Sequence, residues 1–586
     1  MTIMINNMKF FFTPLLLLGS ILLNASCKDK IEDSLAPGIA TPYDPVHESL
    51  EAYTWPVEAG QAKLSQHYRV FASVDGSEEK ELQVLQSDPI VVKQNLDGTI
   101  GEDYQASYTK QRSFSFVNVS FDDSQGHTIR FRVQSLSSTA TSVELAPKSY
   151  GLHATTQGSE ALFEVKDANR YIAVNFFSPD NTVGYSTYGP YDQNVHYDWI
   201  KHMLCIFVDP PKKEIPHIEN KTVCYYRDGV TAQELIDADV IHFRPGYYNL
   251  KGVDLPGAVQ PIGRLIMQDK QMVYIDGGAF VEGIISRTKY GDTKQGVWGR
   301  GILTGRQYMW EPGNNDRAIS SLVVAGSAAS FEGVMFMESP HHGLVPTKNA
   351  TFDNVKFLGW HCNNDAFRPN NGSRITNCFI RAYDDFFYNY NLDVSQCVLW
   401  PGFNGSILTY GWQHYDIGGS VMEDIDIIYP EWKAMGNNCG LVMSQNEYRF
   451  NPINGTTILR DIRIEGPIPG FVNLKPNSNF SSLEQVAQHP DKYGPVPAEQ
   501  LGWLGDLLLE NITIHSQLGD HDRDMKTNLI TGAKGEKVVR GNPEAIWWCK
   551  DITIRNVTVG GVKLSEQNKD KYFTIDPQTT RNIVFE

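Results

Sequence analysis

Three aspartates in the second half of the chain are spaced in a way that suits acid–base chemistry. Asp365 is followed after 19 and 20 residues by the adjacent pair Asp384 and Asp385. Hydrolysis of a glycosidic bond needs a protonated acid at the leaving oxygen and an ionised carboxylate that activates water. Carboxylates that share a site acquire different pKa values, because like charges close together do not all ionise easily. The trio is therefore a candidate for hydrolytic catalysis, whereas the pair Asp122-Asp123 is expected to form a turn.

The aspartates also occupy one column of a repeating pattern. Four short strands are expected to open at His342, Asp365, Asp385 and Gly405, at intervals of 23, 20 and 20 residues. Stacked strands lie about 4.8 Å apart, so Asp365 and Asp385 should be neighbours across one rung, with Asp384 projecting from the turn at another angle. The pattern predicts three carboxylates on one small patch of an exposed sheet. The alternative interpretations are a solvated turn and a calcium site.

Aromatic and amide residues crowd the same rungs. Aromatic faces offer apolar area to the C–H groups of a sugar, and amides bind hydroxyl groups. Any one of these aromatic residues could instead belong to the core. Trp360 and Trp412 are the preferred platforms, because they flank polar turns. The predicted substrate-binding residues are Trp360, Asn364, Tyr383, Tyr388, Asn389, Tyr410 and Trp412.

A second pattern predicts the fold of this half. An apolar residue, any residue, Asn or Asp, an apolar residue, any residue and an apolar residue recur in 352–357, 375–380, 422–427, 459–464, 509–514 and 549–554. With variants centred on Gly333 and Gln396, the early intervals are 21, 23, 19 and 28 residues. A period of this length without helical periodicity indicates stacked rungs, and Asn or Asp at a fixed turn can form hydrogen-bonded ladders. We expect a right-handed parallel β-helix.

The first part of the chain has a different pattern. Residues alternate between apolar and polar in 68–74, 113–119 and 129–133, which predicts antiparallel strands in a β-sandwich. The Pro-rich stretch at 209–213 is the best domain boundary. The predicted organisation is all-β, with a signal peptide at 1–27, a tether at 28–50, the sandwich at 51–211 and the β-helix at 212–586.

The N-terminus predicts export. Lys9 precedes an apolar run over 10–23, and Ala25 and Ser26 then lead to Cys27. This order resembles a bacterial lipoprotein signal, which would make Cys27 the lipidated first residue of an outer-membrane or cell-surface protein, with the periplasmic face also possible. The alternative is an ordinary cleaved secretory signal.

Composition narrows the classes of partner and cofactor. The net charge of −17 weighs against nucleic acid and anionic membrane surfaces as partners. Seven cysteines follow Cys27, none in a CxxC pair. We expect them to be mostly buried, and we predict no metal and no cofactor. The oligomeric state is not indicated.

The motifs resemble one known family. Asn364-Asp365, Asp384-Asp385 and the run 404–412 (Asn-Gly-Ser-Ile-Leu-Thr-Tyr-Gly-Trp) are similar to glycoside hydrolase family 49, which contains dextranases and isopullulanases built from a β-sandwich followed by a right-handed β-helix. The resemblance implies that Asp384 is the general acid, that Asp365 and Asp385 hold and activate water for an inverting displacement, and that the polysaccharide substrate is an α-linked glucan such as dextran.

Three other functions stay open. Polygalacturonases share the fold, an Asp-Asp pair and a Ser-Pro like Ser339-Pro340, but their Gly-His-Gly and Arg-x-Lys motifs are missing at the corresponding place, although Arg368 and Lys433 could meet an anionic group. A non-catalytic surface glycan-binding lipoprotein would bind without hydrolysis. A polysaccharide lyase would need a Lys or Arg base and often calcium.

Overall fold

The computed structural model describes residues 43–586 apart from internal gaps, and the chain from Pro42 to Glu586 forms one compact unit. Cys27, the predicted signal peptide and most of the predicted tether lie outside the described residues. The tether is shorter than predicted, because residues 43–50 already enter strands β1 (Tyr43–His47) and β2 (Leu50–Tyr53). The gaps are residues 91, 95–98, 103–108, 137–141, 187–195, 215–220, 251–262, 309–320, 412–417, 433–438, 446–454, 476–502, 518–527 and 536–542.

Two sheets enclose one apolar core in the N-terminal part of this unit. Burial alternates along the predicted strands at 68–74 and 129–133, so each of these turns one face inward, whereas the strand at 113–121 is buried on both faces. Neighbouring strands are antiparallel, except that β8 (Ser113–Phe121) and β16 (His202–Asp209) pair in parallel. The seven-stranded sheet contains β1, β2, β5 (Leu85–Ser87), β8 (Ser113–Phe121), β10 (Ser142–Ala146), β13 (Arg170–Phe177) and β16 (His202–Asp209); the five-stranded sheet contains β3 (Tyr68–Val74), β4 (Lys80–Leu82), β9 (Ile129–Ser135), β11 (Thr155–Gln157) and β12 (Glu160–Val165).

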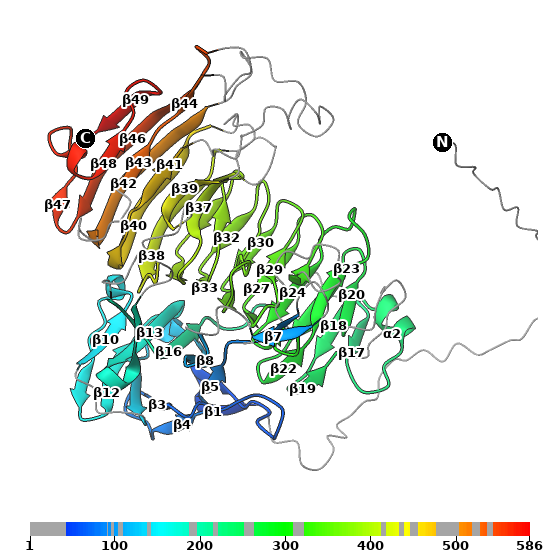
Figure 1. Cartoon of the computed structure of the whole chain (residues 1–586). Helices are drawn as coiled ribbons and strands as arrows, with labels where there is room; N and C mark the ends of the chain where they lie inside the picture. The colour runs from blue at the N-terminus through cyan, green and yellow to red at the C-terminus, as the bar shows by residue number, and fades with distance from the viewer. Residues whose placement is uncertain are drawn as a thin grey trace, which may run out of the picture. The chain divides into compact units, whose positions relative to one another are not determined.

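From β17 (Val223–Tyr225) onward the chain winds through stacked rungs (Figure 1), most of whose strands pair in parallel. Phe352, Ile375 and Val394 lie in register on successive rungs, as the repeat predicts. A sandwich followed by a parallel β-helix is therefore confirmed. The 21-stranded sheet of the β-helix contains β17 (Val223–Tyr225), β18 (Val240–Phe243), β19 (Gly246–Asn249), β21 (Met272–Ile275), β22 (Ala279–Glu282), β24 (Gly296–Gly299), β25 (Ile302–Thr304), β27 (Ser330–Glu332), β28 (Met335–Met337), β30 (Thr351–Asp353), β31 (Lys356–Leu358), β32 (Arg374–Thr376), β33 (Phe379–Ala382), β35 (Asp393–Ser395), β36 (Val398–Pro401), β38 (Val421–Ile428), β40 (Thr457–Ile468), β42 (Leu504–Gln517), β46 (Cys549–Val559), β47 (Val562–Lys563) and β49 (Thr580–Phe585).

Two smaller parallel sheets complete the rungs. One contains β20 (Arg264–Met267), β23 (Ile284–Arg287), β26 (Ser321–Val324) and β29 (His342–Val345); the other contains β34 (Phe387–Tyr388), β37 (Ser406–Gly411), β39 (Gly440–Gln445), β41 (Val472–Leu474), β43 (Asn528–Ile530) and β48 (Phe573–Ile575). The remaining elements are the strand pairs β6 (Val92–Gln94) with β7 (Ile100–Glu102), β14 (Thr182–Ser186) with β15 (His196–Ile200) and β44 (Ala533–Lys534) with β45 (Ile546–Trp547), the helix α2 (Ala232–Asp237), and the 3-10 turns η1 (Asp123–Gln125), η2 (Lys148–Tyr150), η3 (Pro179–Asn181) and η6 (Lys569–Lys571).

The central residue of the repeat is a corner residue with a left-handed backbone. Its φ is positive in Gly333, Asn354, Asn377, Gln396, Asp424, Asp461 and Asn511, between +50° and +76°. Gly, Asn and Asp tolerate this conformation better than other residues, which explains the composition of the repeat. Ladders between rungs also form, since Asn511 Nδ2 donates to Asp461 Oδ1 at 3.1 Å. The residues 549–554, however, pair with 504–509 and not with 509–514 as the repeat suggested.

An aromatic cluster joins the sandwich to the β-helix. Phe207 meets Phe379 with ring centroids 5.0 Å apart, and Phe114 meets Trp400 at 5.9 Å.

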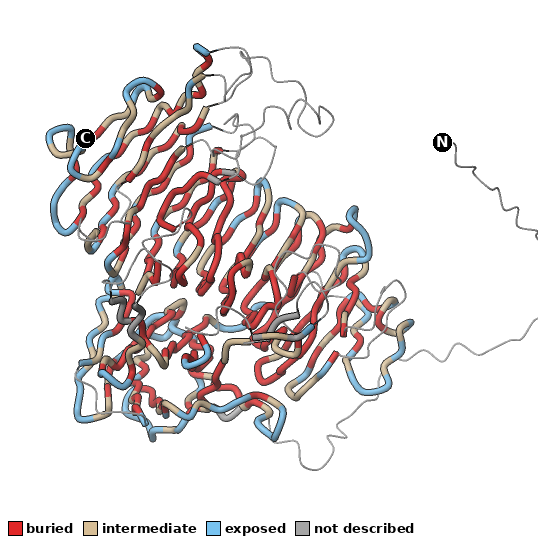
Figure 2. The backbone as a smooth tube through the Cα atoms, in the orientation of Figure 1, coloured by how far each residue is buried: buried red, intermediate tan, exposed pale blue. Residues whose placement is uncertain are grey.

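The inner strands of the β-helix are buried (Figure 2), and all seven cysteines after Cys27 are buried as predicted. Asp122 caps η1, so the turn predicted at Asp122-Asp123 is confirmed. Within the described ranges, no helix is long and apolar enough to span a bilayer.

Candidate active site

The strand column positions Asp365 as predicted. It follows β31 and begins the next segment of the rung. A bridge between Leu344 and Phe367 places Asp365 level with His342 of β29. The two residues therefore lie on successive rungs with their side chains on the same side.

The next step of the column differs by one residue from the prediction. Phe387 of β34 pairs with Leu408 of β37, so Asp385 lies level with Ser406 and not with Gly405. The intervals along the sequence could not show this shift, because the turn that carries Gly405 is one residue longer than assumed. Ser406 consequently becomes a direct partner of Asp385.

All three carboxylates are buried. The exposed fractions of Asp365, Asp384 and Asp385 are 4, 8 and 2%. The predicted exposed patch is therefore wrong. Backbone amides and polar side chains from neighbouring rungs surround the carboxylates and take the place of water as hydrogen-bond donors.

Three donors hold the carboxylate of Asp384. Oδ2 accepts from the backbone amide of Asn363 at 2.8 Å and from Asn404 Nδ2 at 3.0 Å, and Oδ1 accepts from the backbone amide of Asp385 at 2.9 Å. These donors favour the ionised form. Burial and the charges of Asp365 and Asp385 outweigh them and raise the pKa of Asp384 well above its usual range. Asp384 is therefore suited to carry a proton at neutral pH.

Asp385 titrates near neutral pH. Burial, and after it the charge of Asp365, raises the pKa of Asp385 to about 7. Oδ1 accepts from the backbone amide of Ser406 at 3.1 Å and from its hydroxyl at 3.3 Å, which moderates the rise. The group is thus poised between its acid and its base form.

Asp365 is the carboxylate that keeps its charge. Burial alone would raise its pKa, but the surroundings hold the pKa of Asp365 below its usual range: His342 favours the charged form when it is protonated, and Arg368 and Tyr388 favour it as well. His342 Nε2 lies 3.7 Å and Arg368 Nε 3.8 Å from Oδ2, and the Tyr388 hydroxyl donates to the same oxygen. Burial lowers the pKa of His342 to about 3. The imidazole is therefore uncharged at neutral pH, and the positive charge beside Asp365 is that of Arg368.

The arrangement separates an acid from a base. The pKa of Asp384 is raised and that of Asp365 is lowered, so a protonated acid and an ionised base can coexist, as glycoside hydrolysis requires. Among the described residues, no group of three or more His, Cys, Asp or Glu side chains is placed to hold a metal ion.

A glycine supports the aspartate pair from the next rung. Gly405 has φ +86°, and a Cβ added there would lie 2.0 Å from the carbonyl carbon of Asp384 and 2.4 Å from the amide nitrogen of Asp385. Only glycine allows this approach, so Gly405 sets the position of the Asp384–Asp385 peptide bond.

The platform role predicted for Trp360, and the substrate-binding role predicted for Tyr383, are wrong. The two side chains are 1% and 0% exposed, because both face the sandwich. Trp360 Nε1 donates to the Ser87 hydroxyl at 2.9 Å, and Arg112 NH1 donates to the Tyr383 hydroxyl at 2.9 Å. Both residues precede catalytic candidates and contribute to their support.

The amides and Tyr410 also have structural positions. Asn364 is fully buried, and its Oδ1 accepts the backbone amides of Trp360 and His361 at 2.8 and 2.9 Å, which closes the turn before Asp365. Asn389 Nδ2 donates to the Thr457 hydroxyl at 2.9 Å inside the β-helix. Tyr410 is fully buried in the core. Direct binding of substrate by these three side chains is therefore contradicted.

Tyr388 does lie at the carboxylate centre. It is 3% exposed and contacts Asp365 rather than solvent. Trp412, the other predicted platform, lies outside the described residues, as does Lys433.

Several partners of the aspartates were missed. Asn404 and Ser406 flank Gly405 in the sequence, and the rung interval from Asp384-Asp385 was the signal that could have indicated them. The backbone amides of Asn363 and Asp385 have no sequence signature.

A buried ionic network extends from the sandwich to Asp384. Arg112 NH2 lies 2.6 Å from Glu431 Oε1, and Arg381 NH1 lies 3.4 Å from the same oxygen. Both arginines also donate to the hydroxyl of Tyr383, at 2.9 and 2.8 Å. These four side chains are almost fully buried. Because Tyr383 directly precedes Asp384, the network fixes the backbone from which the acid candidate projects.

Comparison with known proteins agrees with this fold. No family model matches the chain. It is 24% identical over 403 residues to a dextranase from Arthrobacter globiformis, covering 62% of this chain and 58% of the relative. It is 21% identical over 283 residues to an isopullulanase from Aspergillus niger, covering 42% of this chain and 49% of that protein. The chain thus spans less than two thirds of the length of the relatives that it matches.

A solved structure covers more of the chain. Dex49A from Penicillium minioluteum superposes with a TM-score of 0.71 at 15% identity, covering 93% of this chain and all of that one. The likeness extends over the sandwich and the β-helix alike. The chain is thus similar in sequence to dextranases and an isopullulanase and similar in fold to Dex49A, which supports the predicted likeness to glycoside hydrolase family 49.

Proposed function

We propose that the chain is a glycoside hydrolase that degrades an α-linked glucan, with dextran as the preferred substrate. The observation that carries this proposal is the buried trio in which Asp384 has a raised pKa and Asp365 a lowered one. The related dextranases and isopullulanase support an α-glucan as the class of substrate.

In the proposed reaction, Asp384 protonates the leaving glycosidic oxygen while Asp365 and Asp385 hold and activate a water molecule. Asp384 Oδ1 accepts only the Asp385 amide among the described residues, so this oxygen retains a lone pair for the proton. Attack of water on the face opposite the leaving group would invert the anomeric carbon.

Digestion of dextran, pullulan and polygalacturonate by the full chain tests the substrate class, with products followed by mass spectrometry and the first anomer by NMR. We expect oligosaccharides from dextran and initial release of the β-anomer. Release from polygalacturonate alone would replace the proposal with a polygalacturonase-like function.

Asp384→Asn tests the role of the acid. It should lower kcat by about 100-fold or more and leave the melting temperature nearly unchanged, because asparagine resembles the protonated acid. Asp393→Asn is the matched control, since Asp393 is an exposed residue of strand β35 in the same β-helix. Full turnover by Asp384→Asn would rule out this role.

We also propose that the chain is exported and anchored in the outer membrane through a lipid on Cys27. The order of Lys9, the apolar run and Cys27 supports this proposal. In a Gram-negative host, Cys27→Ser should move the protein from the membrane fraction to the soluble one and abolish labelling by an azido fatty acid. Unchanged labelling would contradict the anchor.

A further inference from the structure

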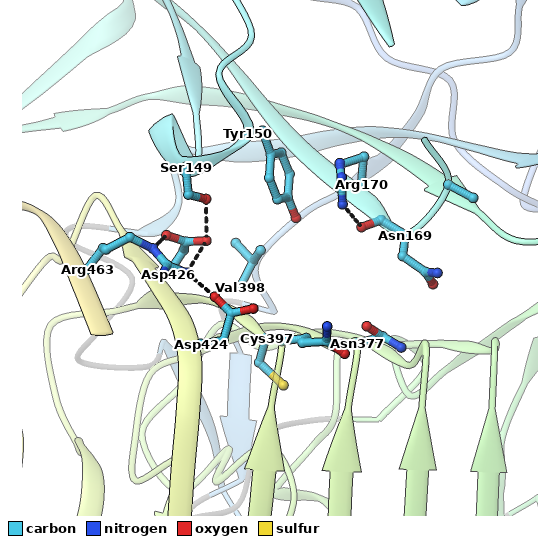
Figure 3. Close-up of a pocket in the computed structure, with 12 residues that line it drawn as sticks. Ser149, Tyr150, Asn169, Arg170, Asn377, Cys397, Val398, Asp424, Asp426 and Arg463 are labelled. Carbon is cyan, nitrogen blue, oxygen red and sulfur yellow. Dashed lines mark hydrogen bonds and ion pairs between the residues drawn. The ribbon is translucent and has the colours of Figure 1, made fainter. Parts of the chain in front are cut away.

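A separate pocket lies where the sandwich meets the corners of the β-helix (Figure 3). Its volume is about 510 Å³, within the range of ligand pockets, which often form at domain interfaces. None of the predicted catalytic or substrate-binding residues lines it. The lining residues are Ser149, Tyr150, Ala168, Asn169, Arg170, Asn377, Gln396, Cys397, Val398, Asp424, Asp426 and Arg463.

The charged side chains of this pocket already have partners. Arg463 NH2 lies 2.8 Å from Asp424 Oδ1, and Arg463 also pairs with Asp426. The Ser149 hydroxyl donates to Asp426 Oδ2 at 2.6 Å, on the left of Figure 3. Arg170 pairs with Asp167 at 2.8 Å. The two arginines balance the two aspartates of the lining, so the pocket does not favour a charged ligand.

Side-chain amides supply the groups that remain for a ligand, although Asn377 Nδ2 already donates to Asp353 Oδ1 at 3.3 Å. Asn377 and Gln396 are corner residues of successive rungs in register with Asp424, so their side chains follow one another at the strand spacing of about 4.8 Å. Asn169 faces Asn377 from the sandwich (Figure 3). Tyr150 also lines the pocket, and the Arg170 guanidinium lies 4.8 Å from the centroid of its ring. The side-chain amides of Asn169 and Gln396 make no hydrogen bond to another described residue. Each offers two donors and one acceptor oxygen.

We propose that this pocket binds a short segment of a neutral saccharide, separately from the carboxylate centre. Uncharged donors and acceptors at regular spacing next to an aromatic ring suit a chain of hydroxyl groups and apolar C–H faces. The choice of an α-glucan as the ligand rests on the proposed function. Such a site would hold a second part of a polymer near the enzyme.

Glycine substitution removes the two amides without strain, because Asn169 and Gln396 have φ +53° and +56°. Isomaltotriose is titrated calorimetrically into the full chain carrying Asp384→Asn, with and without Asn169→Gly and Gln396→Gly. Asn582→Gly, at a corner with φ +55° in the last rung, is the matched control. We expect two classes of site in the parent and in the control, and at least tenfold weaker binding of one class in the double variant.

Equal binding by the double variant and the parent would overturn the inference, as would an empty pocket in a crystal soaked with isomaltotriose. If trigalacturonate competed with isomaltotriose at this site, the ligand would not be limited to neutral saccharides, and that part of the inference would be overturned. A separate measurement tests the proposed function: if the unsubstituted chain releases no product from dextran, that function fails. Isomaltotriose in the pocket of such an inactive chain would still support the inference.

Discussion

The environment of each aspartate decides what it can do. Asp365, Asp384 and Asp385 have the same side chain, but Arg368 and Tyr388 contact only Asp365. Asp384 and Asp385 are raised in pKa by their burial and by the negative charge of the neighbouring Asp365. Arg368 and Tyr388 together therefore favour the ionised form at Asp365 alone.

Arg368→Gln should make the enzyme less tolerant of acid. The guanidinium helps to hold the pKa of Asp365 low, so its removal raises that pKa, and the ionised base is lost at a higher pH. The side chain is 28% exposed and partly screened, so we expect the acidic limb of kcat/KM for dextran to move up by about one pH unit.

Arg374→Gln removes the same charge from an exposed position paired with Asp393 and should leave the limb in place. A profile of kcat/KM between about pH 3 and pH 8 compares the two variants. Equal profiles for Arg368→Gln and the unsubstituted chain would show that Arg368 does not set the charge of Asp365.

Asp385 should lower the stability of the folded protein at neutral pH. Its pKa rises from about 3.9 in an unfolded chain to about 7 in the folded one, so folding favours the protonated form. The stability that this proton provides is complete below about pH 4 and is lost as the pH rises through 7. Asp385→Asn keeps an acceptor oxygen for Ser406 and should stabilise the fold at pH 8 by about 2–4 kcal/mol.

Melting temperatures at pH 8 and pH 4 test this expectation. The variant should melt higher than the unsubstituted chain at pH 8 and at the same temperature at pH 4. A lower melting temperature at pH 8 would mean that the ionised carboxylate stabilises the fold.

At the scale of elements, the rung turns bring the carboxylates together. Gly405→Ala should displace the Asp384–Asp385 peptide bond, because the new Cβ would lie 2.0 Å from the carbonyl carbon of Asp384. We expect kcat to fall at least tenfold and the melting temperature to drop. Gly455→Ala is the matched control, since Gly455 has φ +94° but no atom within 4 Å of an added Cβ. Gly455→Ala introduces only the strain of a left-handed alanine, which lowers the stability by about 1–2 kcal/mol. If the two variants lost kcat and melting temperature equally, Gly405 would not be what positions the Asp384–Asp385 peptide bond.

The rungs could be predicted because their corners leave a mark in the sequence. A left-handed corner requires Asn, Asp or Gly, so Asn354 and Asn377 mark the period directly. That period placed Asp365 level with His342. It did not reveal the longer turn at Gly405, because one extra residue leaves the composition unchanged.

The surroundings of the site depend on contacts that no local pattern carries. Trp360 was predicted as a sugar platform, yet its partner Ser87 lies 273 residues earlier in the chain. An aromatic residue next to a polar turn looks the same whether it faces solvent or another domain. The donors to Asp384 were hidden as well, because two of the three are backbone amides.

At the scale of the whole molecule, the sandwich and the carboxylate centre are physically connected. Arg112 from the sandwich pairs with Glu431 of the β-helix at 2.6 Å and donates to Tyr383, the residue before Asp384. Breaking a buried ion pair costs about 3–5 kcal/mol when the remaining charge has no other partner. Arg381 still lies 3.4 Å from Glu431, so the loss of stability should be smaller than that. Arg112→Met should therefore lower the melting temperature, and it should lower kcat more than it changes KM, because Asp384 loses its alignment while the bound glycan keeps its other contacts.

Two variants separate this coupling from a general loss of stability. Arg69→Met breaks an ion pair with Glu81 on the exposed face of the sandwich and should affect neither stability nor kcat appreciably. Arg112→Lys keeps the charge for Glu431 but not the fork that reaches Tyr383 as well, so it should recover more of the melting temperature than of kcat. If kcat and melting temperature instead recover together, the sandwich supports the β-helix only as a packed surface. If kcat stays low while the fold recovers, the bond to Tyr383 is what aligns Asp384.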